Sequence, residues 1–184
     1  MELVGSRRGE LVQMANHHEL ARLEFSIPAR GLIGLRSRML TATSGEAIMY
    51  HRFESYRPMV GEIAGRANGV LVSMASGRAV AYALLGLQER SVLFIEPGAE
   101  VYEGMIVGEN SRPNDLDVNI TREKKQTNMR ASTADEGIRL IPPRQLSLEQ
   151  AIEFINDDEL VEVTPAHLRL RKRVLAANQR PRKA

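Results

Sequence analysis

The sequence predicts an α+β chain in which a hairpin-and-helix region precedes a larger, mainly-β region. Up to residue 55 the pattern indicates strand, strand, helix, strand, whereas from Tyr56 short strand-like runs alternate with glycine-containing turns. A polar stretch at residues 107–132 then holds almost no side chain suited to a core. We therefore expect two domains, 1–55 and 56–184, the second a barrel-like or sandwich domain with a long polar loop.

The first region is expected to form a hairpin, then a helix and a further strand. Leu23, Phe25 and Ile27 alternate with polar residues, as in a strand with one buried face. Glycine commonly ends a helix in the left-handed conformation, so Gly45 should close the helical segment. The expected elements are the end of a helix at residues 1–8, strands at 10–14 and 21–27, a helix from 28 to 45, and a strand at 47–53.

The second region is expected to consist of short strands with one helix near its end. Residues 147–150, Ser-Leu-Glu-Gln, have the form of a capping box that starts this helix. The tail beyond Ala176 should be loose. The helix is expected to bury Leu148, Ala151, Ile152 and Ile155. Strands are expected at residues 70–74, 79–87, 91–95, 101–107, 137–141, 160–163 and 168–171.

Composition narrows the class of protein. With 43% hydrophobic and 26% charged residues the chain resembles an ordinary globular protein, so wholesale disorder is not expected. The absence of cysteine excludes disulfides and thiolate metal sites and fits a cytoplasmic protein. The N-terminus lacks a secretory signal, and the longest apolar run, residues 79–87, is far shorter than the roughly 20 residues of a spanning helix. We therefore expect no membrane contact.

The sequence contains no recognisable catalytic motif. It lacks the G-x-x-x-x-G-K-[ST] phosphate-binding loop, so this chain alone is not expected to hydrolyse nucleotides. Patterns typical of zinc proteases, EF-hands and α/β-hydrolases are also missing. His17 and His18 are expected to be solvated turn residues and His51 and His167 strand-edge residues, because a metal site needs three or four converging ligands. We expect a chain without enzymatic activity, metal or cofactor.

Positive charge is concentrated in two clusters. The formal net charge is only +2, but residues 165–184 hold seven basic residues and no acidic one. There Arg169 and Arg171 lie on one face of a strand, where they either grip phosphate oxygens or only keep that face soluble. The second cluster spans residues 122–130. Aromatic residues make up only 4% of the chain, so structured RNA read through its backbone suits these clusters better than single strands that need base stacking.

Several stretches carry a family resemblance. They are "SRRGEL" (6–11), "IPARGLIGLRSRMLTATSGEA" (27–47), "VYEGMIVGENSRPNDLDVN" (101–119), "TNMRAS" (127–132) and "DDELVEVTPAHLRLRKR" (157–173). Together they closely resemble the C-terminal portion of the BipA/TypA family of translational GTPases. The resemblance implies that residues 1–55 form most of a unit similar to domain V of elongation factor G, a ferredoxin-like α/β sandwich here without its first strand. Residues from 56 onward resemble the C-terminal domain specific to the family.

The resemblance also implies a function. Family members bind the ribosome beside the A site, and the loop at residues 111–129 is expected to reach large-subunit rRNA and the acceptor end of A-site tRNA. Roles in large-subunit assembly and in translation under stress follow, whereas GTP and Mg²⁺ are expected only on an N-terminal domain absent from this chain. The nucleic-acid-binding residues expected are Arg112, Asn114, Arg122, Lys124, Lys125, Thr127, Asn128, Arg130, Arg169, Arg171, Lys172 and Arg173.

Two other functions are weighed against ribosome binding. One is an autonomous protein-interaction barrel whose basic tail only confers solubility. The other, a small hydrolase using His51 or His167, has no supporting motif. We expect a monomer that binds neither DNA nor membranes, with association possible through the incomplete sheet of residues 1–55, which should also be the less stable region.

Overall fold

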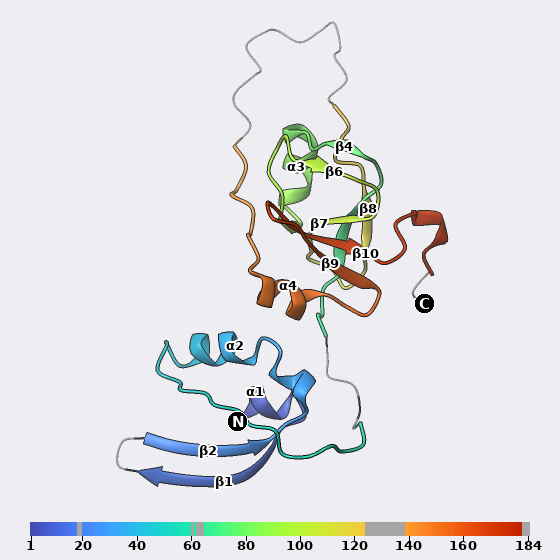
Figure 1. The fold of residues 1–184 in the computed structure, drawn as a ribbon. Coiled ribbons are helices and arrows are strands. Elements are labelled where there is room, and N and C mark those ends of the chain that lie inside the picture. The colour runs from blue at the N-terminus through green and yellow to red at the C-terminus, as the bar shows by residue number, and fades with distance from the viewer. Residues whose placement is uncertain (18–19, 60, 62–64, 124–138, 182–184) are drawn as a thin grey trace, which may run out of the picture. The chain divides into compact units, whose positions relative to one another are not determined.

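The chain folds into two units, residues Met1–Gly65 and Arg66–Ala184. The structure, a computed structural model, describes residues 1–17, 20–59, 61, 65–123 and 139–181 (Figure 1). Both units combine helices and strands, so the predicted α+β class is confirmed. The division lies after Gly65, whereas the sequence placed it after residue 55. Among the described residues no helix combines the length and apolar character needed to cross a bilayer.

The first unit is built around the predicted hairpin. Strands β1 (Glu10–His17) and β2 (Leu20–Ser26) pair antiparallel, with an irregularity in register between Leu11 and Gln13. A short helix α1 (Glu2–Gly5) precedes them, and α2 (Leu35–Ala42) follows. This order of helix, hairpin and helix is compatible with the ferredoxin-like fold expected for the region.

The predicted single helix from residue 28 to residue 45 is divided. A 3-10 turn, η1 (Ala29–Leu32), comes first, and α2 starts only after Gly34, whose φ of 68° lies in the left-handed region. Glycine adopts that conformation at little cost, so Gly34 breaks the helical run. At the other end Gly45 has a φ of 93° and donates its amide to the carbonyl of Leu40 at 2.7 Å, which confirms the predicted stop.

The strand predicted at residues 47–53 is not formed. Side chains at and just after the end of this segment contact β2: Arg52 pairs with Glu24 at 3.4 Å, and Ser26 Oγ donates to Glu54 at 2.7 Å. The residue types suit a strand, but no backbone hydrogen bond joins this segment to the free edge of β2 in the described residues, and a strand is defined by such pairing. Its apolar side chains therefore stay exposed, Ile48 at 81% and Tyr50 at 90%.

The second unit is organised around one open six-stranded sheet. Its strand order is β8-β3-β7-β10-β9, with β5 also pairing with β7, and β4 and β6 form a separate two-stranded sheet. The predicted barrel is not confirmed, because in the described residues β8 and β9 are opposite edges of the sheet. The strands are β3 (Val70–Ser73), β4 (Gly77–Arg78), β5 (Ser91–Leu93), β6 (Glu100–Val101), β7 (Met105–Asn110), β8 (Leu116–Val118), β9 (Glu159–Val163) and β10 (Leu168–Lys172).

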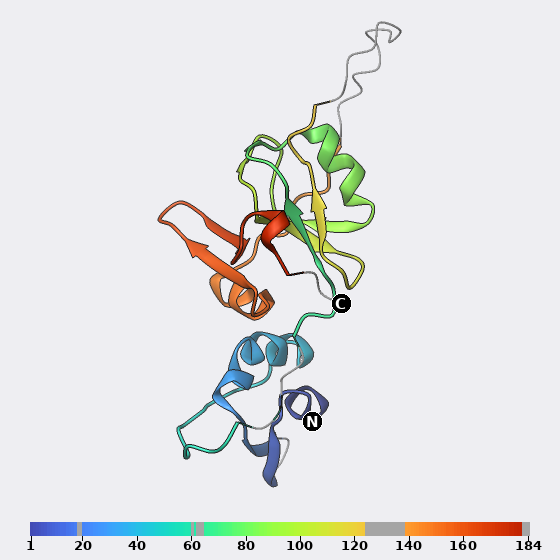
Figure 2. The same ribbon diagram turned by 90° about the vertical axis from the view of Figure 1, so that its right-hand side faces the viewer.

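Each face of this sheet supports a separate hydrophobic cluster. In β7 the side chains alternate, so that Met105 and Val107 join one cluster and Ile106 joins the other. Helix α3 (Ala81–Gln88) contributes Leu84 and Leu87 to the first cluster. Helix α4 (Leu148–Phe154) contributes to the second, and the two helices lie on opposite sides of the sheet (Figures 1 and 2).

Helix α3 corrects the strand predicted at residues 79–87. The run is apolar almost throughout, so periodicity alone cannot distinguish a buried strand from a buried helix. Its Ala and Leu content favours a helix, and the helix buries Leu84 and Leu87, which lie three residues apart on one face.

Helix α4 confirms the predicted capping box and, through Ala151 and the partly buried Ile155, only part of the predicted buried face. Ser147 Oγ accepts from Gln150 N at 3.3 Å, and the Gln150 side chain accepts from Ser147 N at 3.0 Å. The buried residues are Ala151 and Phe154, whereas Leu148 is 47% exposed. Phe154 is selected because its ring packs edge-on against Phe94 with 5.2 Å between centroids. Ile152 is also exposed, contrary to the prediction.

The polar stretch at residues 107–132 contributes more to the core than its composition predicts. Its start belongs to β7, and it contains β8. Val107, Val118 and Ile120 are at most 7% exposed, so the expectation that this stretch lines no core is wrong for its first half. The strand expected at 137–141 is not formed in its described part, residues 139–141.

The tail is better anchored than predicted. A 3-10 turn, η3 (Ala177–Gln179), follows β10, and Arg180 Nη1 pairs with Asp117 at 2.5 Å. The same guanidinium donates to the carbonyls of Val174 and Leu175 at 3.1 and 2.8 Å. The amide of Ala177 also donates to Glu103 at 3.1 Å, so the chain up to Arg180 is held to the unit at two positions.

Candidate nucleic-acid interface

Strand β8 separates the predicted loop residues into two groups. It runs parallel to β3, with Leu71 opposite Leu116 and Ser73 opposite Val118. Residues 111–114 therefore precede β8 at one end of the sheet, and the residues after Val118 leave at the other end. Arg112 and Asn114 belong to the first group and Arg122 to the second, so the structure does not bring them together.

Arg112 and Asn114 lie in a tight turn between β7 and β8. The amide of Gly69 donates to the carbonyl of Arg112 at 2.7 Å, and Asn110 Nδ2 donates to the carbonyl of Asn114 at 2.7 Å. A Cβ on Gly69 would lie 2.1 Å from the carbonyl oxygen of Asn114, so the turn fits only against glycine. Both predicted side chains are exposed on a backbone that is held in place.

Arg122 follows a turn at the opposite end of β8. The Asn119 side chain accepts from the amide and hydroxyl of Thr121 at 3.1 and 3.0 Å, which orders the chain up to that point. Arg122 is exposed and pairs with no carboxylate in the described part of the chain. The remaining predicted loop residues, Lys124, Lys125, Thr127, Asn128 and Arg130, lie outside the described residues.

Arg169 and Arg171 do share a face of β10, as predicted, but a carboxylate lies with them. Glu162 on β9 is 3.7 Å from Arg169 Nη1 and 3.9 Å from Arg171 Nε. Tyr102 donates its hydroxyl to the same carboxylate at 2.7 Å. Burial and the contact with Glu162 raise the pKa of Tyr102 to about 12. The two arginines are therefore half-buried, oriented and partly neutralised, while Arg173 beyond them is exposed and has no described side-chain partner.

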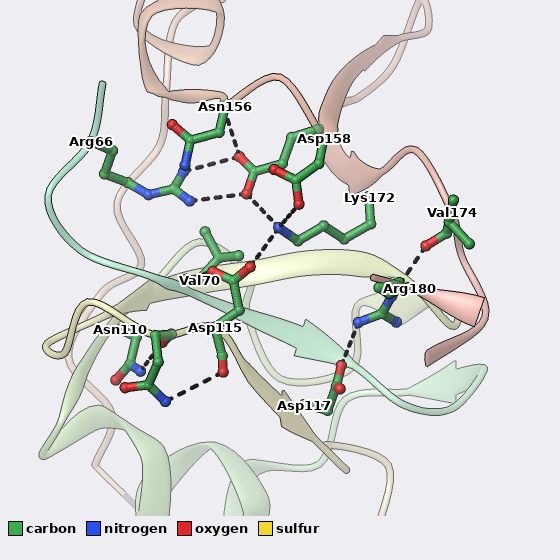
Figure 3. A network of polar contacts seen from close by, with 12 residues as sticks. Arg66, Val70, Asn110, Asp115, Asp117, Asn156, Asp158, Lys172, Val174 and Arg180 are labelled. Carbon is green, nitrogen blue, oxygen red and sulfur yellow. Dashed lines mark hydrogen bonds and ion pairs between the residues drawn. The ribbon is translucent and has the colours of Figure 1, made fainter. Parts of the chain in front are cut away.

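Lys172 is placed differently from its neighbours. It is 2% exposed, and its ammonium donates to Asp115 at 2.7 Å and to Asp158 and Glu159 at 2.8 Å each (Figure 3). Burial by itself lowers the pKa of Lys172, but these three hydrogen bonds outweigh it and raise the pKa above its ordinary value. The outward contact expected of Lys172 is thus replaced by an internal one.

Arg66 completes this buried charge cluster. Its two terminal nitrogens bond the two oxygens of Glu159 at 3.0 and 2.9 Å, a bidentate pair whose side chains are 6% and 0% exposed. The guanidinium also lies 4.3 Å from the centroid of the Phe154 ring. Glu159 is thus held between two cations, Arg66 and Lys172. Arg66, the first residue of the second unit, is in this way fastened to α4 and β9.

The carboxylates of this charge cluster are also the candidate ligands of a metal ion. Oxygens of Asp115, Asp158 and Glu159 lie within 4.8 Å of one another. The Lys172 ammonium already bonds all three, so the position that a cation would take is filled by the protein's own charge. His51 and His167 are exposed and join no group of possible ligands in the described residues.

Sequence reasoning missed the partners that organise these basic residues. Lys172 bonds Asp115, which is 57 residues away in the chain, and Glu159, which is 13 residues away. Tyr102 bonds Glu162, which is 60 residues away. Only the alternation of β10 could have indicated an internal partner, because it places Lys172 on the same inward face as Leu168 and Leu170. By strand alternation it faces the side opposite to Arg169 and Arg171.

Comparison with known proteins identifies both units. The profile described as TypA/BipA C-terminal domain matches residues 68–177, and the profile of the elongation factor G C-terminus matches residues 1–67. The chain is 54% identical over 186 aligned residues to the large ribosomal subunit assembly factor BipA of Salmonella typhimurium and 53% identical to that of Escherichia coli K12. The match to the Bacillus subtilis protein of the same name is 48%.

These alignments cover at least 99% of this chain but only 30% of each relative. The chain thus spans less than a third of the length of the curated relatives that it matches. The family profile covers most of the second unit, including β3 to β10 and every residue of the charge cluster except Arg66. The chain therefore belongs to the TypA/BipA family and corresponds to the C-terminal portion of its members.

Proposed function

We propose that this chain is a non-catalytic ribosome-binding portion of a TypA/BipA protein that serves assembly of the large ribosomal subunit. The observation that carries the proposal is the match along the whole chain to relatives named large ribosomal subunit assembly factor. The finer proposal is that it contacts large-subunit rRNA and the acceptor end of A-site tRNA in the cytoplasm, and takes part in translation under stress. GTP and Mg²⁺ belong, in this proposal, to a part of the protein outside this chain.

The distribution of charge in the second unit supports an RNA partner. Exposed arginines at both ends of β8 and after β10 have no carboxylate partner in the described residues, notably Arg112, Arg122 and Arg173. Two carboxylates of this unit, Glu162 and Asp115, instead form ion pairs with Arg169 and Lys172. Guanidinium groups without internal partners on a folded surface suit the phosphates of structured RNA.

Co-sedimentation with bacterial large ribosomal subunits across a salt series tests the proposal. We expect binding whose affinity falls steeply as salt rises, because each phosphate contact releases counterions. The variant Arg122→Ala/Arg173→Ala should bind more weakly and with a shallower salt slope. Absence of binding at low salt, or binding that does not respond to salt, would contradict an RNA interface.

Repeating the binding experiment after nuclease digestion of the RNA distinguishes RNA binding from binding by a protein-interaction module. That alternative is favoured by one observation, the exposed apolar residues of α3, where Leu85 is 36% exposed. Capture of ribosomal proteins that survives complete RNA digestion would support the alternative. A GTPase assay on the chain should show no turnover above the buffer rate.

A further inference from the structure

The turn at residues 111–114 is held in place by several hydrogen bonds. Besides the bonds from Gly69 and Asn110 to its carbonyls, the next residue, Asp115, is held on both carboxylate oxygens. Oδ1 accepts from the amide of Val70 at 3.0 Å, and Oδ2 accepts from the buried ammonium of Lys172 at 2.7 Å. Asn110 is itself 4% exposed. The turn that presents Arg112 therefore needs little ordering when a partner binds.

A second arginine lies beside this turn. The amide of Ser111 donates to the carbonyl of Arg90 at 3.0 Å, directly before the register pair of Ser91 with Asn110. Arg90 is thus bonded to Ser111, the residue directly before Arg112, so the two arginines lie on adjacent segments of the chain. Both are exposed, and neither pairs with an acidic side chain among the described residues.

Most carboxylates at this end of the sheet already bond another side chain. Glu109 accepts from Arg144 and from Asn68, each at 3.2 Å, and Asp115 accepts from the Lys172 ammonium, which also bonds Asp158 and Glu159. Glu89, exposed beside Arg90 in the chain, is the remaining acid close by in sequence. Glu109 and Asp115 therefore bond other side chains, and the guanidinium groups of Arg90 and Arg112 pair with neither of them in the described residues.

We propose that Arg90 and Arg112 form a phosphate-contacting corner that binds the backbone of structured RNA. The corner lies at the opposite end of β8 from Arg122, so it is a contact separate from the one expected of residues 122–130. It rests on the proposed function, because the phosphates are those of ribosomal RNA. Arginine suits the role because its planar group donates two parallel hydrogen bonds to phosphate oxygens.

The test compares two variants that remove the same charge. Arg90→Ala/Arg112→Ala changes the corner, and Arg36→Ala/Arg78→Ala removes two exposed arginines that likewise lack a described partner. Binding of the full chain to large ribosomal subunits is measured as affinity and as the slope of log K against log salt. The corner variant should bind roughly tenfold more weakly, with a slope shallower by about 0.9 for each phosphate that it no longer neutralises. The control variant should change less in both quantities.

A charge-preserving variant sharpens the result. Arg90→Lys/Arg112→Lys should keep most of the salt slope but lose affinity, because an ammonium cannot make the bidentate contact. Equal affinity and slope for the corner and control variants would overturn the corner while leaving the proposed function in place. A wild-type chain that does not bind large subunits would overturn both. Thermal unfolding of each variant confirms that the exposed substitutions leave the fold intact.

Discussion

Lys172 shows how a single residue can change role between sequence and structure. In the sequence it belongs to a run of basic residues that suits phosphate binding, whereas in the fold its ammonium forms ion pairs with three carboxylates. The reason is its register in β10, where it follows Leu168 and Leu170 on the inward face. A charged side chain can be buried there only because its partners are buried or half-buried with it.

Replacing Lys172 should therefore affect stability more than any neighbouring basic residue. Lys172→Met leaves Glu159, which is 2% exposed, with one cation fewer. Breaking a buried ion pair from one side costs about 3–5 kcal/mol. We expect a loss of that size in the free energy of unfolding by urea. Arg173→Met is the matched control and should stay within about 0.5 kcal/mol; equal losses for the two variants would contradict the buried role.

Tyr102 predicts a dependence of stability on alkaline pH. Its pKa rises from about 10 in the unfolded chain to about 12 in the fold, so the folded state holds the proton more tightly. The resulting stabilisation is complete below pH 10 and is lost as pH rises through 12. Urea unfolding at pH 9 and pH 11 should show a fall in stability that Tyr102→Phe reduces. An unchanged fall in the variant would assign the effect to other groups, such as the lysines.

At the scale of elements, α3 and β8 are where local pattern was insufficient. The run around α3 has no periodicity because nearly every residue is apolar, and its Ala and Leu content together with its packing through Leu84 and Leu87 makes it a helix. Strand β8 is three residues long and lies among polar residues, so nothing in its composition indicates it. It exists because β3 offers a parallel edge, to which Leu116 and Val118 pair. By contrast, the hairpin β1-β2 and strands β9 and β10 were predicted, since alternation defines them.

Two glycines allow the same substitution to be tested with opposite expected signs. Gly86 lies inside α3, is exposed, and a Cβ there would meet nothing within 4 Å. Gly86→Ala should therefore raise the free energy of unfolding by about 0.5–1 kcal/mol, because alanine is the better helix former.

Gly69→Ala should instead be destabilising. Its Cβ would lie 2.1 Å from Asn114 O and 2.7 Å from Asp115 N, and both are backbone atoms that cannot move aside alone. We expect a loss of about 1–3 kcal/mol, measured by urea unfolding beside Gly86→Ala. A neutral Gly69→Ala would show that the turn at residues 111–114 is less tightly held than its hydrogen bonds indicate.

At the scale of the whole molecule, the two units differ in how much they bury. Among the described residues of the first unit the buried hydrophobic side chains are Val4 and Leu35, whereas the second unit has a cluster on each face of its sheet. A two-stranded hairpin is only marginally stable without further packing. Incomplete burial also leaves surface for association through the first unit, which stays a prediction, as does the expected monomer.

Hydrogen exchange should reveal this difference. Amides in β1 and β2 are expected to exchange much faster than those in β3, β7 and β10, because local opening of the first unit exposes little apolar surface. The measurement is exchange followed by mass spectrometry on the intact chain. Equal protection in the hairpin and the central sheet would contradict the expected difference in stability.

The sequence by itself determined the α+β class, the hairpin, the capping box of α4 and the family resemblance that the comparisons confirmed. These features depend on residues close together in the chain, or on stretches such as residues 157–173 that can be read directly. Only the tertiary structure decided that residues 81–88 are helical, that β8 divides the polar stretch, and that Lys172 is internal. The physical reason is that burial and ion pairing depend on partners distant in the chain, as when Arg66 bonds Glu159 across 93 residues. No local pattern reports such a partner.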